Sequence, residues 1–305
     1  MYLEHFGLTD APFRLTPNLA YRFEDSSQAA ARTLVRTALD QGAGFIKVTG
    51  EVGLGKTLLC RSLLGELAEP YLTAWLPDPH VSPSTLRSAL ARDLGVILPS
   101  RPTQQEVHYR LQSSLAEQVA AGRRPVFLID EAQALSDSAL ETVRLLTNLE
   151  TEQRKLLQVV LFGQPELDQR LASPKFRQLR QRIVHSCTLE PLDRSDVERY
   201  LDHRLAAAGC DRPLFTRAAV AAIARASGGT PRLVNILADK ALLAAFGRGK
   251  SRAGRGEVRR AVADTEATRD ALWWPKWQPT ARLAAFSLVA FGVFLALEAW
   301  LGGSS

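Results

Sequence analysis

An eight-residue stretch rich in glycine is the first place where this chain could do chemistry. Residues 50–57 read GEVGLGKT, which fits the phosphate-loop pattern G-x-x-x-x-G-K-[ST]. Glycines let the backbone turn tightly and aim its N–H groups at a phosphate beside a helix N-terminus. Lys56 is expected to reach the β- and γ-phosphates, and the Thr57 hydroxyl to bind Mg²⁺. The predicted binding residues are Gly50, Glu51, Val52, Gly53, Leu54, Gly55, Lys56, Thr57 and Leu58.

Two adjacent carboxylates follow an apolar run in PVFLIDEAQ, residues 125–133. This pattern is typical of a central parallel strand whose C-terminal end opens onto a site. Asp130 is expected to hold Mg²⁺ through water, and Glu131 to orient and deprotonate an attacking water. A core strand capped by solvated acids is the alternative, which the nearby phosphate loop disfavours. The two motifs together predict that bound ATP is hydrolysed.

Gln164 and a group of three arginines are further candidate residues of the predicted ATPase site. Gln164 ends another apolar run, where it could contact a phosphate or a water. The stretch FRQLRQRIV, residues 176–184, then places three arginines on a short predicted helix. Arg182 is the preferred candidate for a finger that reaches the nucleotide of a neighbouring subunit. Spacing does not decide among Arg177, Arg180 and Arg182, and a solvated basic helix is the alternative.

A second candidate sensor lies in SGGTPRLVNIL, residues 227–237. Glycine stops one helix, Thr230 is placed to cap the next, and Pro231 is suited to its first position. Arg232 then falls in the first helical turn, where a cation is unfavourable beside the helix dipole. An anionic partner would explain it, so Arg232 is predicted to sense the nucleotide rather than to be a plain surface arginine.

The elements that must position these residues can be read from hydrophobic periodicity. The pattern predicts an α/β phosphate-loop domain over residues 1–190, with a parallel sheet between helices, and an all-helical lid over residues 191–270. Strands are expected at 45–49, 71–76, 126–130, 157–163 and 183–189, and helices at 26–41, 56–68, 83–94, 103–121 and 137–151. Lid helices are expected at 193–208, 216–226, 231–246 and 256–270.

Composition argues against a disulfide-stabilised, a metal-binding or a secreted protein. Three separated cysteines form neither a disulfide framework nor a C-x-x-C pair, and five scattered histidines show no metal-binding spacing. The opening residues lack the apolar core of a secretory signal.

The net charge of +6 lies mostly in RGKSRAGRGEVRR, residues 248–260. Such a run suits an anionic membrane surface or nucleic acid, with a solvated surface as the alternative.

The last residues before GGSS are LAAFSLVAFGVFLALEAWL, residues 283–301. As a helix they would extend over about 28 Å, close to the roughly 30 Å hydrocarbon core of a bilayer. Tryptophans flank the segment, and Lys276 and Arg282 lie only before it. We expect a linker at 271–281, one transmembrane helix at 282–301 and a periplasmic tail at 302–305, with the ATPase domain in the cytoplasm. A final helix of the lid core is the alternative.

The phosphate loop, the acidic strand end and the GGTPR segment resemble the AAA+ superfamily. The opening MYLEHFGLTDAPFRLTPN and the string LLTNLET…LLQVVLFGQPEL…QLRQRI are similar to the general secretion pathway A (ExeA-like) group. Within that group, the resemblance is greatest to ATPases of MSHA (mannose-sensitive haemagglutinin) pilus biogenesis. It implies a bacterial inner-membrane ATPase that assembles a type IV pilus or a type II secretion machine.

The same resemblance implies a ring-like homo-oligomer and inner-membrane partner proteins of the pilus or secretion system. It carries over to Gly50–Thr57, Asp130, Glu131, Gln164, Arg182 and Arg232. Several relatives continue into a peptidoglycan-binding domain, whereas this chain stops four residues after the apolar segment. Direct cell-wall binding by this polypeptide is therefore not expected.

Two other functions fit parts of the sequence. A DNA-associated ATPase of the transposition-regulator type would use the basic run 248–260 on phosphate backbone, although no sequence-specific nucleic-acid binding is expected. A phosphate-loop kinase would transfer the phosphoryl group to a small molecule. Glu131 directly after Asp130 favours water activation over that transfer.

Overall fold

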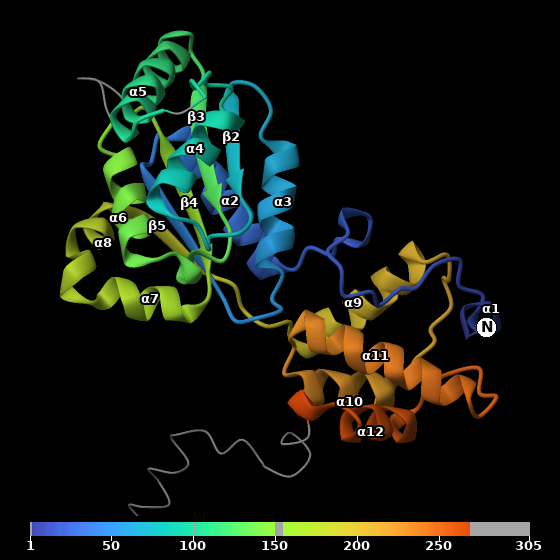
Figure 1. Ribbon diagram of the computed structural model, residues 1–305. Coiled ribbons are helices and arrows are strands. Elements are labelled where there is room, and N and C mark those ends of the chain that lie inside the picture. Colours follow the sequence, from blue (N-terminus) through green and yellow to red (C-terminus); the bar gives the residue numbers. More distant parts are fainter. Residues whose placement is uncertain (1, 101, 150–154, 269–305) are drawn as a thin grey trace, which may run out of the picture.

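The computed structural model describes residues 2–100, 102–149 and 155–268 (Figure 1). Its centre is a five-stranded sheet in the order β2-β3-β4-β1-β5, in which every neighbouring pair is parallel. This confirms the predicted α/β class. The strands are β1 (Phe45–Thr49), β2 (Tyr71–Leu76), β3 (Arg124–Ile129), β4 (Gln158–Gly163) and β5 (Ile183–Thr188).

Both faces of the sheet are buried by helices, which explains why the central strands read as continuous apolar runs. Along β3, Val126 and Leu128 pack on one face while Phe127 and Ile129 pack on the other. The first face is covered by α2 (Ser26–Asp40) and α3 (Lys56–Glu66). The opposite face is covered by α4 (Pro83–Asp93), α5 (Gln104–Ala120), α6 (Asp137–Leu146), α7 (Pro165–Ala172) and α8 (Arg177–Arg182).

Side-chain caps fix where several helices begin. Asp25 accepts a hydrogen bond from the Gln28 backbone at 2.8 Å at the start of α2. Thr103 and Glu106 form a capping box at the start of α5. Ser136 caps α6 with its hydroxyl oxygen, which accepts a hydrogen bond from the Ala139 backbone at 3.2 Å. Short 3-10 turns complete the α/β domain at Ala132–Ala134 and Pro174–Phe176.

The helices of a second domain lie near the carboxyl ends of the strands, where the phosphate loop follows β1 (Figure 1). They are α9 (Arg194–Ala207), α10 (Arg217–Ser227), α11 (Pro231–Phe246) and α12 (Arg255–Ala263). Their apolar sides form one buried cluster, with Leu201, Ile223 and Leu242 in its centre. We call this unit the helical domain.

The N-terminal segment belongs to the helical domain, which corrects the sequence-based assignment of all residues from 1 to 190 to the α/β domain. Its elements are α1 (Tyr2–Phe6) and a 3-10 turn at Leu19–Tyr21. Phe6, Leu8, Phe13 and Tyr21 are buried in the core of the helical domain. Chain order misled the prediction, because the segment contacts helices that lie about 200 positions further along the chain.

Two helix ends and one whole helix also differ from the sequence prediction. The helix predicted at 137–151 ends at Leu146, and the one predicted at 256–270 ends at Ala263. Helix α7 was not expected, although Pro165 at its first position and Glu166 in its first turn are helix-start signals.

The predicted linker at 271–281, the transmembrane helix at 282–301 and the tail at 302–305 lie outside the described residues. Within the ranges that the structure describes, no helix combines the length and apolar character needed to cross a membrane.

Candidate nucleotide-binding site

The phosphate loop joins β1 to α3, as the sequence pattern predicts. Gly53 and Gly55 have φ values of 85° and 91°, in the left-handed region that favours glycine. The first N–H groups of α3 have no helical carbonyl partner and point toward the loop. The loop therefore has the form of an anion site at a helix N-terminus.

Lys56 is the first residue of α3, and its side chain is only 4% exposed. Its ammonium group donates to the carbonyl oxygens of Gly50 at 2.7 Å and Glu51 at 2.9 Å. Burial lowers the pKa of Lys56, and the carboxylates of Glu131 and Asp130 oppose that shift. A cation held in this way is placed to meet a phosphate at the loop.

Asp130 directly follows β3 and is buried. Burial raises the pKa of its carboxyl, while a hydrogen bond with the Thr57 side chain lowers it. Asp130 also accepts a hydrogen bond from the Glu131 backbone at 2.9 Å. Carboxylate and hydroxyl oxygens are ligands that Mg²⁺ prefers, so Thr57 and Asp130 are the residues that could hold the ion.

Glu131 is the only described residue other than glycine with a positive φ, at 49°. This left-handed conformation is uncommon outside glycine and is often found at functional sites. One carboxylate oxygen, Oε2, accepts hydrogen bonds from Gln133 Nε2 at 2.6 Å and Gln164 Nε2 at 3.0 Å. The Gln164 backbone also donates to Gln133 Oε1 at 2.9 Å. The carboxylate is therefore oriented from two sides, one of which, Gln133, was not among the predicted site residues.

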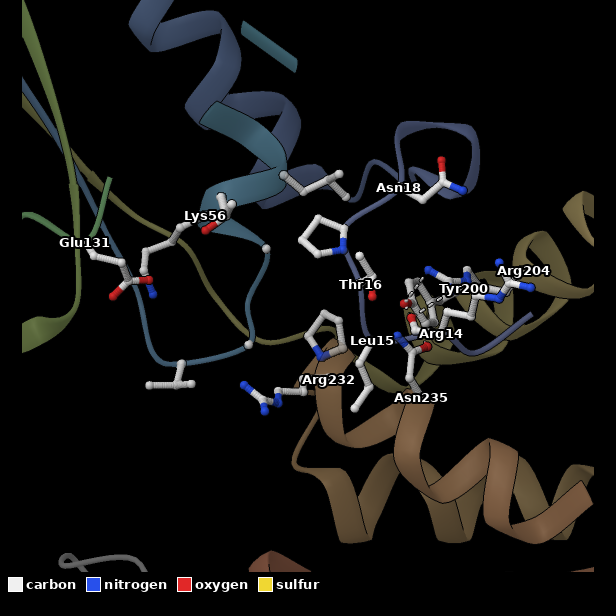
Figure 2. A pocket seen from close by; sticks show the side chains of 17 residues that line it. Arg14, Leu15, Thr16, Asn18, Lys56, Glu131, Tyr200, Arg204, Arg232 and Asn235 are labelled. Carbon is white, nitrogen blue, oxygen red and sulfur yellow. Dashed lines mark hydrogen bonds between the residues drawn. The ribbon is translucent and has the colours of Figure 1, made fainter. Parts of the chain in front are cut away.

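A cavity of about 310 Å³ lies between the two domains (Figure 2). The α/β domain contributes the phosphate loop, Lys56, Thr57, Leu58 and Glu131. The helical domain contributes α9 and the start of α11. The N-terminal segment completes the wall with Arg14, Leu15, Thr16, Pro17 and Asn18. Glu131 thus meets six of the nine predicted binding residues in one cavity, and Gly50, Glu51 and Leu54 do not line it.

Arg232 extends into this cavity from the first turn of α11 and is exposed (Figure 2). Its backbone N–H donates to the Gly53 carbonyl at 3.3 Å. A side chain at Gly53 would meet the Arg232 Cβ at 2.7 Å, so the glycine also permits this close approach. The start of α11 is therefore in direct contact with the phosphate loop. Thr230 precedes α11 as predicted, but its side chain makes no capping hydrogen bond.

The wall formed by residues 14–18 was missed by the sequence reasoning. It is fastened to α9 by Arg204, a buried side chain that donates to the Pro12 carbonyl at 2.5 Å and the Arg14 carbonyl at 3.2 Å. The guanidinium also lies 4.8 Å from the ring centroid of Tyr21. No motif marks such a contact, because it joins residues about 190 positions apart.

The arginines of α8 lie apart from this cavity. Arg180 donates to the Ala172 carbonyl at 3.0 Å, and Arg177 is exposed. Arg182 is half-buried at the end of α8, and it does not line the cavity of its own chain. In the described part of the chain, no ion pair joins any of the three to a carboxylate. The structure therefore does not bring Arg182 together with the other predicted site residues.

Comparison with known proteins agrees with this arrangement. The family described as "AAA domain" matches residues 38–171. General secretion pathway protein A of Aeromonas hydrophila is 40% identical over 292 residues, which cover 96% of this chain and 53% of that protein. The chain thus spans about half the length of this curated relative.

Solved structures with much lower identity share the fold. Cdc6p of Pyrobaculum aerophilum has a TM-score of 0.65 at 17% identity, covering 84% of this chain and 70% of that one. The ORC1 protein of Aeropyrum pernix, solved with DNA, has a TM-score of 0.61 at 19% identity, covering 83% of this chain and 69% of that one. Together with the AAA domain, the similarity that runs along nearly the whole chain shows that it resembles the general secretion pathway A (ExeA-like) group of AAA+ proteins.

Proposed function

We propose that this protein is a membrane-anchored ATPase that hydrolyses ATP to ADP and phosphate and uses the energy to assemble an envelope machine. The observation that carries the proposal is the meeting of Lys56, Thr57 and Glu131 around one cavity, with Asp130 beside Thr57. Lys56 is a cation that can bind phosphate, and Thr57 and Asp130 supply oxygen ligands for a metal. Glu131 is a base that can deprotonate water.

Each residue has a distinct part in the proposed hydrolysis. The phosphate loop and Lys56 bind the β- and γ-phosphates. Thr57 and Asp130 would hold Mg²⁺, which would supply positive charge to neutralise the phosphates. Glu131 accepts the proton of the attacking water, and Gln164 and Gln133 keep its carboxylate in one orientation.

The helical domain acts as a lid in this proposal. Arg232 is an exposed cation at the cavity, and its own backbone touches the phosphate loop at Gly53. A γ-phosphate would give the guanidinium an anionic partner, so hydrolysis would change how firmly the start of α11 is held. The N-terminal segment would move with this domain, because Arg204 fastens it to α9.

The proposed working form is a ring-like homo-oligomer. Arg182 lies outside the cavity of its own chain at the end of α8. Supplied to the ATP of a neighbouring subunit, it would stabilise charge in the transition state and couple hydrolysis to assembly of the ring.

The proposed setting is the bacterial inner membrane, with the ATPase domain in the cytoplasm. The apolar residues 283–301, with basic residues only on their N-terminal side, support a single-pass anchor. The relative in Aeromonas is named for the general secretion pathway. We therefore propose inner-membrane proteins of a type IV pilus of the MSHA kind, or of a type II secretion-like machine, as partners.

Purification from membranes tests this function. The full chain should stay with membranes through carbonate extraction, as a spanning helix does. In detergent, the Glu131→Gln variant with ATP should retain pilus or secretion proteins that the Lys56→Ala variant loses, as mass spectrometry would show. A chain that carbonate releases would contradict the anchor. Identical partners for both variants would contradict ATP-driven assembly.

A further inference from the structure

The helical domain carries an excess of positive charge, and most of it lies away from the nucleotide site, which Arg232 lines. Residues 212–260 contain eleven arginines and lysines and two acidic residues, a net charge of +9. The whole chain has a net charge of only +6, so the remaining residues are acidic in balance. Charge is therefore concentrated on α10, α11, α12 and the loops between them.

Both acidic residues in this stretch are already engaged. Glu257 is buried, and its carboxylate accepts hydrogen bonds from Arg248 and Lys250, each at 2.9 Å. Asp239 accepts a hydrogen bond from the Tyr2 hydroxyl at 2.8 Å. Just beyond the stretch, Asp264 pairs with Lys240 at 2.7 Å. Ten of the eleven cations are exposed, so most of the positive charge faces solvent.

Helix α12 presents part of this charge on one side. At 3.6 residues per turn, Arg255, Arg259 and Arg260 fall on the same half of the helix, and all three are exposed. The other half buries Val258 and Val262 in the domain core. In the described part of the chain, no ion pair joins these arginines to a carboxylate. We call Arg248, Lys250, Arg252, Arg255, Arg259 and Arg260 the basic face.

The basic face is remote from the nucleotide. Helix α12 packs on α10 and α11, on the side of the helical domain that faces away from the sheet (Figure 1). The cavity, in contrast, is lined by α9 and the start of α11. A partner on the basic face would leave the phosphate loop open.

Chain order places this face next to the proposed anchor. Helix α12 ends at Ala263, and the apolar residues 283–301 follow it in the sequence. Fourteen residues separate Thr268 from Leu283, so the connection spans at most about 50 Å. Tethering at this range gives a high effective concentration of the domain at the bilayer surface. Basic residues at a cytoplasmic surface are attracted by anionic headgroups, by about fivefold for each charge.

We infer that the basic face lies against the anionic headgroups of the membrane, and that this contact turns the nucleotide site away from the bilayer. The inference rests on the proposed anchor. The proposed partner of the basic face is a phospholipid layer with net negative charge.

The test places the full chain in vesicles of phosphatidylcholine, with or without phosphatidylglycerol. A donor fluorophore at Ser251→Cys reports its distance from acceptor-labelled headgroups. A second donor position at Ser113→Cys on α5 serves as the reference, and labelled chain without an added cysteine gives the background. Energy transfer from position 251 should rise when phosphatidylglycerol is present. It should fall again in about 0.5 M salt, where charges are screened within several ångströms.

Charge-reversal variants distinguish the effect of the basic face from the effect of the net charge of the chain. The triple variant Arg255→Glu, Arg259→Glu, Arg260→Glu should lose the increase in transfer. The matched triple Arg92→Glu, Arg110→Glu, Arg123→Glu reverses three exposed cations of the α/β domain and should keep it. Equal transfer in both kinds of vesicle, from chain that is fully incorporated, would overturn the inference while leaving the anchor intact.

Two further outcomes have fixed meanings. If the chain does not incorporate at all, the anchor proposal fails, and flotation with phosphatidylglycerol vesicles then tests the face alone. Flotation that the triple variant loses would support the face, and no flotation would overturn it. Binding of a short DNA duplex through these arginines, with no response to phosphatidylglycerol, would assign the face to nucleic acid and overturn the lipid inference.

Discussion

The side-chain amide of Gln164 donates a hydrogen bond to Glu131 at 3.0 Å, on the same carboxylate oxygen that accepts from Gln133 at 2.6 Å. Gln164 comes from the end of β4 and Glu131 from the end of β3, which are neighbouring strands. The parallel sheet thus brings together two residues 33 positions apart and uses one to orient the other.

Removing this contact is expected to slow hydrolysis without preventing binding. In Gln164→Ala, Glu131 keeps only the Gln133 donor, and its carboxylate is less well aligned with water. We expect kcat to fall by about 10- to 100-fold, since small misplacements of a reacting group have effects of that size. Phosphate release and ATP affinity should be measured together, with Gln178→Ala on α8 as the control. An unchanged kcat would show that Gln164 does not contribute to hydrolysis.

Arg182 is expected to act between subunits. Neither Arg182→Ala nor Glu131→Gln should hydrolyse ATP well alone. A mixture should recover part of the activity, because some interfaces then pair an intact finger with an intact Glu131. Mixing with Arg177→Ala or Arg180→Ala in place of Arg182→Ala shows whether another arginine has this role. No recovery in demonstrated mixed oligomers would assign Arg182 to its own subunit.

Arg204 is expected to hold the N-terminal wall of the cavity. Lysine retains the charge but cannot reach the Pro12 and Arg14 carbonyls with the same planar geometry. Arg204→Lys should therefore raise the KM for ATP several-fold and lower stability by about 1–3 kcal/mol. Arg194→Lys, on the exposed side of α9, is the matched control. A loss of stability with unchanged KM would show that the segment is only structural.

Acid should weaken the helical domain through Glu257. Hydrogen bonds from Lys250, the Gly254 backbone and Arg248 lower the pKa of this carboxyl from 4.5 to about 2. Because the folded-state pKa is depressed, its stabilisation is fully present above about pH 4.5 and is lost as the pH falls toward 2. Hydrogen exchange in α12 should show this loss, on the order of 2 kcal/mol. The variant Glu257→Gln should abolish this pH dependence of stability, and the control Glu198→Gln should retain it. An unchanged pH profile in Glu257→Gln would exclude this carboxyl as the cause.

The sheet and the phosphate loop could be predicted because their signals are local. The run FIKVT before the loop and the helical spacing after Lys56 each lie within a dozen residues. The ends of β3 and β4 were equally clear, since Asp130 and Gln164 follow continuous apolar runs. Parallel strands bring their carboxyl ends to one edge, so the proximity of these residues follows from the fold class.

The parts that could not be predicted depend on contacts between distant residues. Phe6 and Phe13 look like any apolar residues near a chain end, yet they are buried against α9–α12. Gln133 gave no sign that it would bind Glu131, because that bond depends on the left-handed backbone at Glu131. Whether Arg182 reaches a neighbouring nucleotide depends on a second subunit, which one sequence does not describe.

The most direct test of the central claim measures ATP binding and phosphate release on the same preparations of the chain, Lys56→Ala and Glu131→Gln. We predict that the chain binds and hydrolyses ATP and that Lys56→Ala loses both properties. Glu131→Gln should bind ATP with normal affinity but release phosphate at least about 100-fold more slowly, because only water activation is removed. Near-normal phosphate release by Glu131→Gln, or unimpaired ATP binding by Lys56→Ala, would contradict the assignment of this site.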